Sequence, residues 1–242
     1  MIARAALFLA TFALIAGCGS EDESPNAALA SAAEKTADVK TLRQEFTMES
    51  DLGGDRFTFD GTGINTVDNK TGRMDGTMDV GDGPFEFESI SVDDAMYLKS
   101  DEFGLPEGKW LKTEDVPATT MSPGEFVGFL KDSEGVEQVG TETIRGEQTT
   151  HYRGPLDIKA MAEQSGSEIV EELRKTPNID KLDIVVDIWV RPDGLPARLA
   201  LDMSAPGEAE GTMKMTSDIL EYDVPVDVEA PPASDVTDSL GG

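Results

Sequence analysis

The sequence predicts an α+β fold: a long, curved antiparallel sheet of about 10–12 strands forms a half-barrel, and roughly three or four helices cover its concave face. Apolar and polar residues alternate over much of residues 42–112, which is the period of strands that bury one face. Short turns rich in Gly and Asp separate these runs, and such turns join antiparallel neighbours. Helical spacing is confined to a few short segments.

The first seventeen residues have the organisation of a lipoprotein signal peptide. Arg4 supplies a positive charge, and residues 5–16 form an apolar stretch of roughly 18 Å as a helix, too short to cross a ~30 Å hydrocarbon core. The stretch ends in Ala16-Gly17-Cys18, which matches a lipobox, and Cys18 is the only cysteine. We expect cleavage before Cys18 and a lipid anchor on its thiol, which would hold the chain on the extracytoplasmic face of the cell membrane. The alternative is an ordinary signal peptide followed by a chance cysteine.

The rest of the chain has the length of one domain. We assign residues 18–25 to a lipidated linker, 26–228 to a half-barrel domain and 229–242 to an acidic, Pro-rich tail. With the one cysteine lipidated, no disulfide is expected, so the fold must depend on its core. No apolar run after the signal peptide reaches the length of a membrane span.

The chain is strongly acidic, with 48 acidic and 20 basic residues and a formal net charge of −28. A field of this sign repels nucleic acid and bare anionic lipid surfaces, so neither is an expected partner. The carboxylates are dispersed over every segment, which favours an adaptation to salty surroundings over the recognition of a basic partner.

If the acidity is such an adaptation, the melting temperature should rise with salt. Dispersed carboxylates repel one another at 0.01 M salt, where the Debye length is ~30 Å, and are screened near 1 M, where it is ~3 Å. Thermal unfolding across this range of salt measures the effect. A melting temperature that stays flat would exclude the adaptation.

The first helix is predicted over residues 26–40, where Leu29, Ala33 and Ala37 recur at helical intervals. From residue 42 the period changes to two, with Phe57 and Phe59 as a clear example of alternation. A second helix is predicted from Ser122 to about residue 133, since Ser122, Pro123 and Glu125 form a capping box with proline at the first helical position.

The second half of the chain has the same mixture of elements. Strands are predicted at residues 136–139, 142–145 and 148–153, and further helices start at Asp157 and Ser167. Residues 182–191 form the strongest strand, and residues 191–194 turn it into a hairpin. Met213 and Met215 have the opposite parity to Leu220 and Tyr222, which predicts a bulge near residues 217–219.

No catalytic constellation is evident, and we expect neither an enzyme nor a cofactor. His151 is the only histidine, no G-x-S-x-G motif occurs, and the single cysteine is expected to carry lipid, so a nucleophilic triad is not supported. We interpret His151 as a hydrogen-bonded histidine within a strand. A metal site is not expected either, because no second histidine or EF-hand spacing occurs and chance clusters are common among 48 carboxylates.

Eight methionines fall at positions on the predicted apolar faces, beside several phenylalanines. Methionine adapts to irregular volumes, so these residues suit a lining for flexible acyl chains; ordinary core packing is the alternative. The residues expected to line an apolar ligand cavity are Phe46, Met48, Phe57, Phe59, Met74, Met78, Phe85, Phe87, Phe126, Phe129, Leu130, Met161, Ile184, Val186, Ile188, Leu199, Leu201, Met213 and Met215.

The short helix after Ser122 is a candidate gate for this cavity. We expect Phe126, Phe129 and Leu130 to face the sheet, with Phe57, Phe59, Met74 and Met78 receiving them. A short helix with three large apolar contacts depends on tertiary packing and would open early. The alternative is a helix that seals the core and does not move.

Several stretches resemble the LppX/LprG group of actinobacterial lipoproteins. Residues 139–146 with Thr149-Thr150-His151-Tyr152 are similar to one hairpin of that group, and residues 187–198 (DIWVRPDGLPAR) are similar to its late hairpin. Residues 96–99 (MYLK) and 109–111 (KWL) are similar to its central strands. Together with the lipobox and the Ala-rich helix, the resemblance covers most of the mature chain.

The resemblance implies a LolA-like half-barrel: a curved sheet closed on one side by helices around an apolar cavity. It also implies a monomer that binds a lipid or acylated glycolipid and carries or presents it across the cell envelope, with an envelope transporter as a candidate partner. The alternative is a non-catalytic interaction or sensor lipoprotein with a filled core. The net charge of −28 departs from the group's pattern, which leaves the identity of the ligand open.

Overall fold

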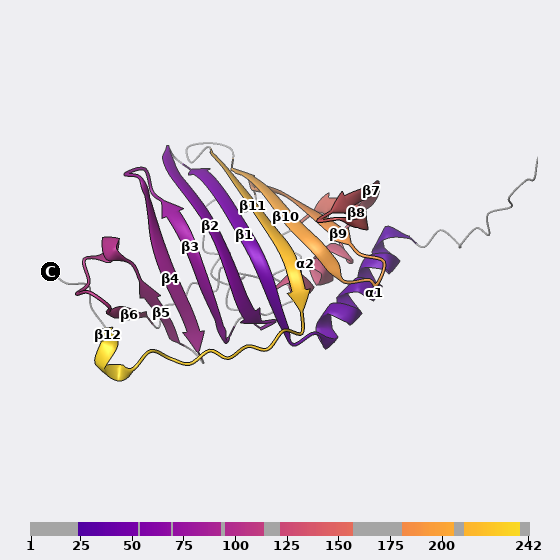
Figure 1. Cartoon of the computed structure of the whole chain (residues 1–242). Coiled ribbons are helices and arrows are strands. Elements are labelled where there is room, and N and C mark those ends of the chain that lie inside the picture. The colour runs from indigo at the N-terminus through magenta and orange to yellow at the C-terminus, as the bar shows by residue number, and fades with distance from the viewer. Residues whose placement is uncertain are drawn as a thin grey trace, which may run out of the picture.

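The computed structural model describes residues 24–52, 54–68, 70–92, 95–113, 122–156, 181–205 and 211–237. One twelve-stranded sheet dominates these residues, in the order β12-β6-β5-β4-β3-β2-β1-β11-β10-β9-β8-β7 (Figure 1). The elements are α1 (Pro25–Asp38), β1 (Thr41–Leu52), β2 (Asp55–Thr66), β3 (Gly72–Asp79), β4 (Pro84–Val92), β5 (Ala95–Lys99), β6 (Trp110–Thr113), α2 (Pro123–Leu130), β7 (Glu137–Ile144), β8 (Glu147–Pro155), β9 (Asp183–Val190), β10 (Pro196–Ala205), β11 (Gly211–Tyr222) and β12 (Val236–Thr237).

The predicted fold class is confirmed, with fewer helices described than expected. Two α-helices occur among the described residues, and the helices expected at Asp157 and Ser167 fall in residues 157–180, outside them. Helix α1 ends two residues earlier than predicted because Val39 is extended. Where the structure is described, neither helix has the length and apolar character needed to span a bilayer.

The predicted capping box of α2 is present. The Ser122 hydroxyl accepts a hydrogen bond from the backbone N–H of Glu125, and the Glu125 carboxylate accepts one from the backbone N–H of Ser122. These two bonds satisfy backbone donors that a helix start leaves without partners. Pro123 then occupies the first turn, as the sequence predicted.

Two strand predictions are corrected. Residues 136–139 and 142–145 were expected to be separate strands, but residues 137–144 form the single strand β7, which pairs with β8 and shifts register between Gln138 and Gly140. The extra residue of this irregularity breaks the alternation of polar and apolar residues, which is why the sequence indicated two strands.

The stretch that the sequence assigned to a tail contains a short strand. Val236 and Thr237 form β12, which pairs in parallel with Trp110 and Leu111 of β6 and so completes one edge of the sheet. The Lys109 ammonium donates a hydrogen bond to the Ser234 carbonyl and lies 3.7 Å from the Asp235 carboxylate. A strand of two residues is too short to show a period, so the sequence could not indicate it.

Strand register places the apolar positions of the sheet on one face. Residues directly opposite one another in neighbouring strands point to the same side. One such row crosses eight strands through Tyr152, Ile188, Leu199, Ser217, Phe46, Gly61, Gly76 and Phe87. We call this side the apolar face and the opposite side the polar face.

The predicted bulge keeps the end of β11 on the apolar face. Gln44 pairs with Ile219 and Arg43 pairs with Glu221, so Leu220 is the extra residue. The bulge therefore lies one residue beyond the predicted position. Both Ile219 and Tyr222 join the core on the apolar side as a result.

The main core lies between the two helices and one half of the sheet. Leu29 of α1 and Phe126, Val127 and Leu130 of α2 are buried in one cluster with side chains of β8 to β11. Their strand partners in this cluster are Tyr152, Ile184, Val186, Ile188, Val190, Leu199, Leu201 and Ile219. This half of the apolar face is thus filled by the chain's own helices.

Glycines on β2 and β3 let aromatic rings lie against the other half of the apolar face. A Cβ on Gly61 would lie 2.9 Å from the Phe59 ring, and one on Gly76 would lie 2.5 Å from the Asp60 carbonyl oxygen and 3.1 Å from the Phe87 ring. The two glycines are direct cross-strand partners. Their missing side chains provide the space that the rings occupy.

We expect Gly76→Ala to lower the free energy of unfolding by about 1–3 kcal/mol, because the new methyl group meets backbone that cannot move cheaply. The matched control is Gly128→Ala in α2, where a Cβ meets nothing within 4 Å. That variant should be neutral or more stable by up to about 1 kcal/mol, from helix propensity. Urea unfolding of both variants checks the prediction, and equal stabilities would contradict it.

Candidate functional site

The apolar face carries the described strand residues that the sequence assigned to a ligand cavity. Strand register places every cavity candidate in β1 to β4 and in β9 to β11 on this face. Phe126, Phe129 and Leu130 lie on α2. Met161 and Cys18 fall outside the described residues, and so the structure places neither.

These candidates separate into two clusters. Ile184, Val186, Ile188, Leu199 and Leu201 are buried in the helix-covered cluster described above. A second cluster, which we call the aromatic row, consists of Phe46, Phe59 and Phe87, with Met48, Phe57, Met74, Met78 and Met215 packed around it.

One expected contact of α2 is wrong. Phe126, Phe129 and Leu130 were expected to meet Phe57, Phe59, Met74 and Met78, but they pack into the helix-covered cluster with Leu29 and the strands β8 to β11. The periodicity gave the inward side of the helix correctly. It could not give the strands that receive it, because sheet order depends on long-range pairing.

The aromatic row runs across neighbouring strands, from Phe46 on β1 through Phe59 on β2 to Phe87 on β4. The ring centroids of Phe46 and Phe59 are 5.4 Å apart and those of Phe59 and Phe87 are 5.2 Å apart, which are ordinary distances for aromatic pairs. The three rings are 6–8% exposed, whereas the surrounding methionines and Phe57 are only half-buried. The result is a fixed aromatic floor with an adaptable methionine rim.

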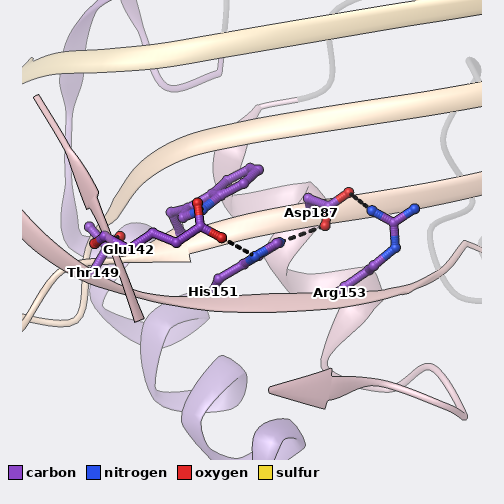
Figure 2. Close-up of polar contacts among 6 residues, drawn as sticks. Glu142, Thr149, His151, Arg153 and Asp187 are labelled. Atoms are coloured by element: carbon purple, nitrogen blue, oxygen red, sulfur yellow. Dashed lines mark hydrogen bonds and ion pairs between the residues drawn. The ribbon is translucent and has the colours of Figure 1, made fainter. Parts of the chain in front are cut away.

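The polar face carries a hydrogen-bonded network around His151 (Figure 2). The imidazole Nδ1 lies 2.9 Å from the Glu142 carboxylate and the Nε2 lies 2.6 Å from the Asp187 carboxylate. The Arg153 guanidinium donates to the other oxygen of Asp187 at 2.7 Å. His151 is therefore a hydrogen-bonded strand residue, as the sequence predicted, and its partners lie on β7 and β9.

This geometry does not make His151 a general base for a nucleophile. Both ring nitrogens face carboxylate oxygens, and they satisfy both contacts as donors only when the ring carries two protons. A serine triad needs one ring nitrogen directed at the nucleophile. Within the described part of the chain, no group of three or more His, Cys, Asp or Glu side chains is arranged to hold a metal ion.

Trp189 and Arg198 extend the network along the polar face. The Trp189 ring stacks on His151 with centroids 4.2 Å apart, and its indole N–H donates to Glu142 at 3.0 Å. Arg198 binds both oxygens of Asp218, and this pairing raises the pKa of Arg198. The sequence did not indicate this network; the only signal for it is the polar residues at alternate positions of β8 and β9.

The tip of the β7–β8 hairpin also contacts the polar face. Arg145 and Gly146 form the two-residue turn between β7 and β8, both with positive φ, as a type I′ hairpin turn requires. Arg145 reaches Glu45 on β1 at 2.8 Å and lies 3.8 Å from Asp218 on β11. The hairpin therefore folds over the polar face, which explains how residues 100 positions apart meet.

Glu142 should contribute stability that is lost in acid. The hydrogen bonds from the Trp189 indole and from His151 lower the pKa of Glu142 below its ordinary 4.5. A carboxyl group with a lowered pKa stabilises the fold above its unfolded pKa, and this contribution disappears as pH falls through the folded value. The stability difference between wild type and Glu142→Gln should therefore shrink below about pH 4.5. Urea unfolding from pH 7 to pH 3 measures it, and a constant difference would contradict the assignment.

Two of the hollows lined by described residues lie outside the helix-covered half of the apolar face. One, of about 570 Å³, lies over β3 and β4 and includes Arg73, Glu88 and Lys99. The other, of about 390 Å³, lies at the end of β1, β2 and β11 and includes Arg56, Phe57 and Lys214.

Comparison with known sequences gives one partial relative. No family model matches the chain. A Streptomyces griseus protein, described as an uncharacterized 31.2 kDa protein in the rplA-rplJ intergenic region, is 30% identical over 142 residues, or 57% of this chain. The match covers 44% of that protein, so the chain spans less than half the length of this relative.

Comparison with solved structures identifies proteins of similar fold. The structure of LprF from Mycobacterium bovis has a TM-score of 0.56 and 15% identity, over 86% of this chain and 96% of that chain. The Mycobacterium tuberculosis lipoprotein LppX gives a TM-score of 0.49 at 15% identity, over 86% of this chain and 100% of that chain. The resemblance expected from the sequence is therefore confirmed at the level of fold, and this chain has the fold of LprF.

Proposed function

We propose that this protein is an extracytoplasmic lipoprotein, anchored at Cys18, that binds a lipid or acylated glycolipid on its apolar face and carries or presents it across the cell envelope. The observation that supports the proposal is the aromatic row with its half-buried methionine rim on β1 to β4. A sheet face of this kind offers a flat apolar floor and side chains that adapt to a flexible chain.

The burial of an acyl chain supplies enough free energy for such binding. Moving a chain of about sixteen carbons from water to an apolar surface contributes on the order of 10 kcal/mol, at ~0.8 kcal/mol for each CH₂ group, before the costs of association. A lipid in a membrane already has this burial, so the apolar face must match it for the lipid to be transferred, and the transfer itself involves no chemical step.

The test is lipid binding by the full chain carrying Cys18→Ser, purified from its host without its own lipid anchor. Native mass spectrometry should find co-purified lipid, and a fluorescent acyl probe should be taken up. Met78→Gln should weaken probe binding on the order of tenfold, because it places a polar amide on the apolar face.

Thr77→Gln is the matched control, since Thr77 is the exposed neighbour of Met78 on the polar face. It should bind the probe as the wild type does. Apoprotein alone in the mass spectrum, together with no uptake of the probe, would overturn the proposed function.

A second candidate is an interaction or sensor lipoprotein with a filled core. The low exposure of the aromatic row, 6–8% for each ring, favours it, because a row already covered leaves less surface for a ligand. Under this alternative, Phe59→Ala lowers stability as a core truncation does and the wild type takes up no acyl probe.

A further inference from the structure

The smaller hollow lies at the edge of the sheet where β1 ends and β2 and β11 begin, and residues of the polar face line most of it. Its volume is about 390 Å³, within the range of small-molecule sites. Ser50 and Phe57 belong to the apolar face, where Ser50 pairs with both Phe57 and Met213. Glu49 and Lys214 pair on the polar face. A molecule in this hollow can therefore have polar groups on one side and apolar groups continuing toward the aromatic row.

Four charges of alternating sign surround the hollow. Asp51 pairs with Arg56 across β1 and β2, and Glu49 pairs with Lys214 across β1 and β11. The two carboxylates are two residues apart on β1 and so share a face. The hollow is formally neutral in a chain whose net charge is −28.

Both cations keep hydrogen-bonding capacity for a ligand. The Arg56 side chain is 82% exposed, and its ion pair with Asp51, at 3.2 Å, uses the Nε donor out of five N–H donors on the guanidinium. The Lys214 side chain is 68% exposed, and its ammonium lies 3.9 Å from Asp202, beyond hydrogen-bond distance.

The larger hollow differs in that contacts within the protein engage its cations more fully. Its Arg73 contacts both Asp75 and Glu88, and its Lys99 binds Glu88 at 2.9 Å and lies over the Trp110 ring. Its charged strand residues lie on the polar face, as those of the smaller hollow do, and Phe87 of the aromatic row also lines it. It therefore serves as a matched comparison for the smaller hollow.

We propose that the smaller hollow binds the zwitterionic phosphate–amine head group of a phospholipid. The phosphate binds the cations Arg56 and Lys214, and the ammonium binds the carboxylates Glu49 and Asp51, so that each charge of the ligand meets charges of opposite sign. The acyl chains then continue past Phe57 onto the apolar face. This inference rests on the proposed function and names its ligand class.

The experiment compares three lipids with identical acyl chains, using the full chain carrying Cys18→Ser. Phosphatidylethanolamine should bind more tightly than diacylglycerol and phosphatidylglycerol, on the order of tenfold in Kd. Arg56→Gln with Lys214→Gln should remove this preference and leave diacylglycerol binding unchanged. Arg73→Gln with Lys99→Gln, in the larger hollow, is the matched control and should keep the preference. Free phosphoethanolamine should not bind measurably, because it lacks the acyl chains.

Equal binding of the three lipids would overturn the head-group site while leaving the proposed function in place. The same holds if both double variants lose the preference equally. If free phosphoethanolamine binds as tightly as the whole lipid, the acyl chains contribute nothing, and the proposed function is overturned instead. If none of the three lipids binds, the proposed function fails, and the head-group site fails with it.

Discussion

Replacing Phe126 with alanine is expected to lower the free energy of unfolding by about 3–5 kcal/mol. The side chain is 6% exposed and packs in the helix-covered cluster with Leu29 of α1 and Ile188 of β9. Removing the ring opens a cavity between two helices and the sheet, which close-packed surroundings fill only in part. Urea unfolding of the purified variant measures the loss.

Phe129→Ala is the matched control on the same helix. Its ring is half-buried at the margin of the same cluster, so its truncation should cost clearly less than that of Phe126. In the double variant, uptake of an acyl probe should fall only as far as the folded fraction falls. If uptake were lost while the unfolding curve stayed at its wild-type position, α2 would be a gate and not a part of the core.

Local features of the fold were predictable because short stretches of chain determine them. Alternation gave the apolar face of β1, β2 and β9, and the change of parity between Met215 and Tyr222 indicated the bulge that the register shows at Leu220. The cap of α2 followed from Ser122, Pro123 and Glu125 alone. Each of these features depends on interactions within a few residues or on a period of two.

Features that depend on sheet order were not predictable. The sequence placed Phe126 on an inward-facing side of a helix, yet β8 to β11 receive it and β2 and β3 do not. The pairing of Val236 with Trp110 joins strands 126 residues apart, and two residues carry no period. The hollow at Arg56 and Lys214 likewise exists only because β11 returns beside β1.

The network on the polar face also depends on sheet order, so its partners were not predictable either. His151 was correctly interpreted as a hydrogen-bonded strand residue, but its partners come from β7 and β9 and could not be named from the sequence. Their assembly requires the register of three strands at once.

Asp187→Ala is expected to lower the free energy of unfolding by about 3–5 kcal/mol. The Asp187 side chain is 5% exposed and accepts hydrogen bonds from His151 Nε2 at 2.6 Å and from Arg153 at 2.7 Å. His151 is itself only 7% exposed, so its Nε2 would remain buried without the carboxylate that faces it. Leaving a buried polar group without its partner costs more than the bond contributes.

Asp202→Ala is the matched control for this prediction. Asp202 also lies on the polar face of the sheet, but its side chain is 46% exposed and lies 3.9 Å from Lys214, so its removal should cost less than about 1 kcal/mol. Urea unfolding at pH 7 separates the two variants. Asp187→Asn keeps the shape of the side chain and should lose less than Asp187→Ala, since an amide oxygen still accepts one of the two hydrogen bonds. Equal stability of the Asp187→Ala and Asp202→Ala variants would mean that water replaces the carboxylate at His151 and that the network contributes little to the fold.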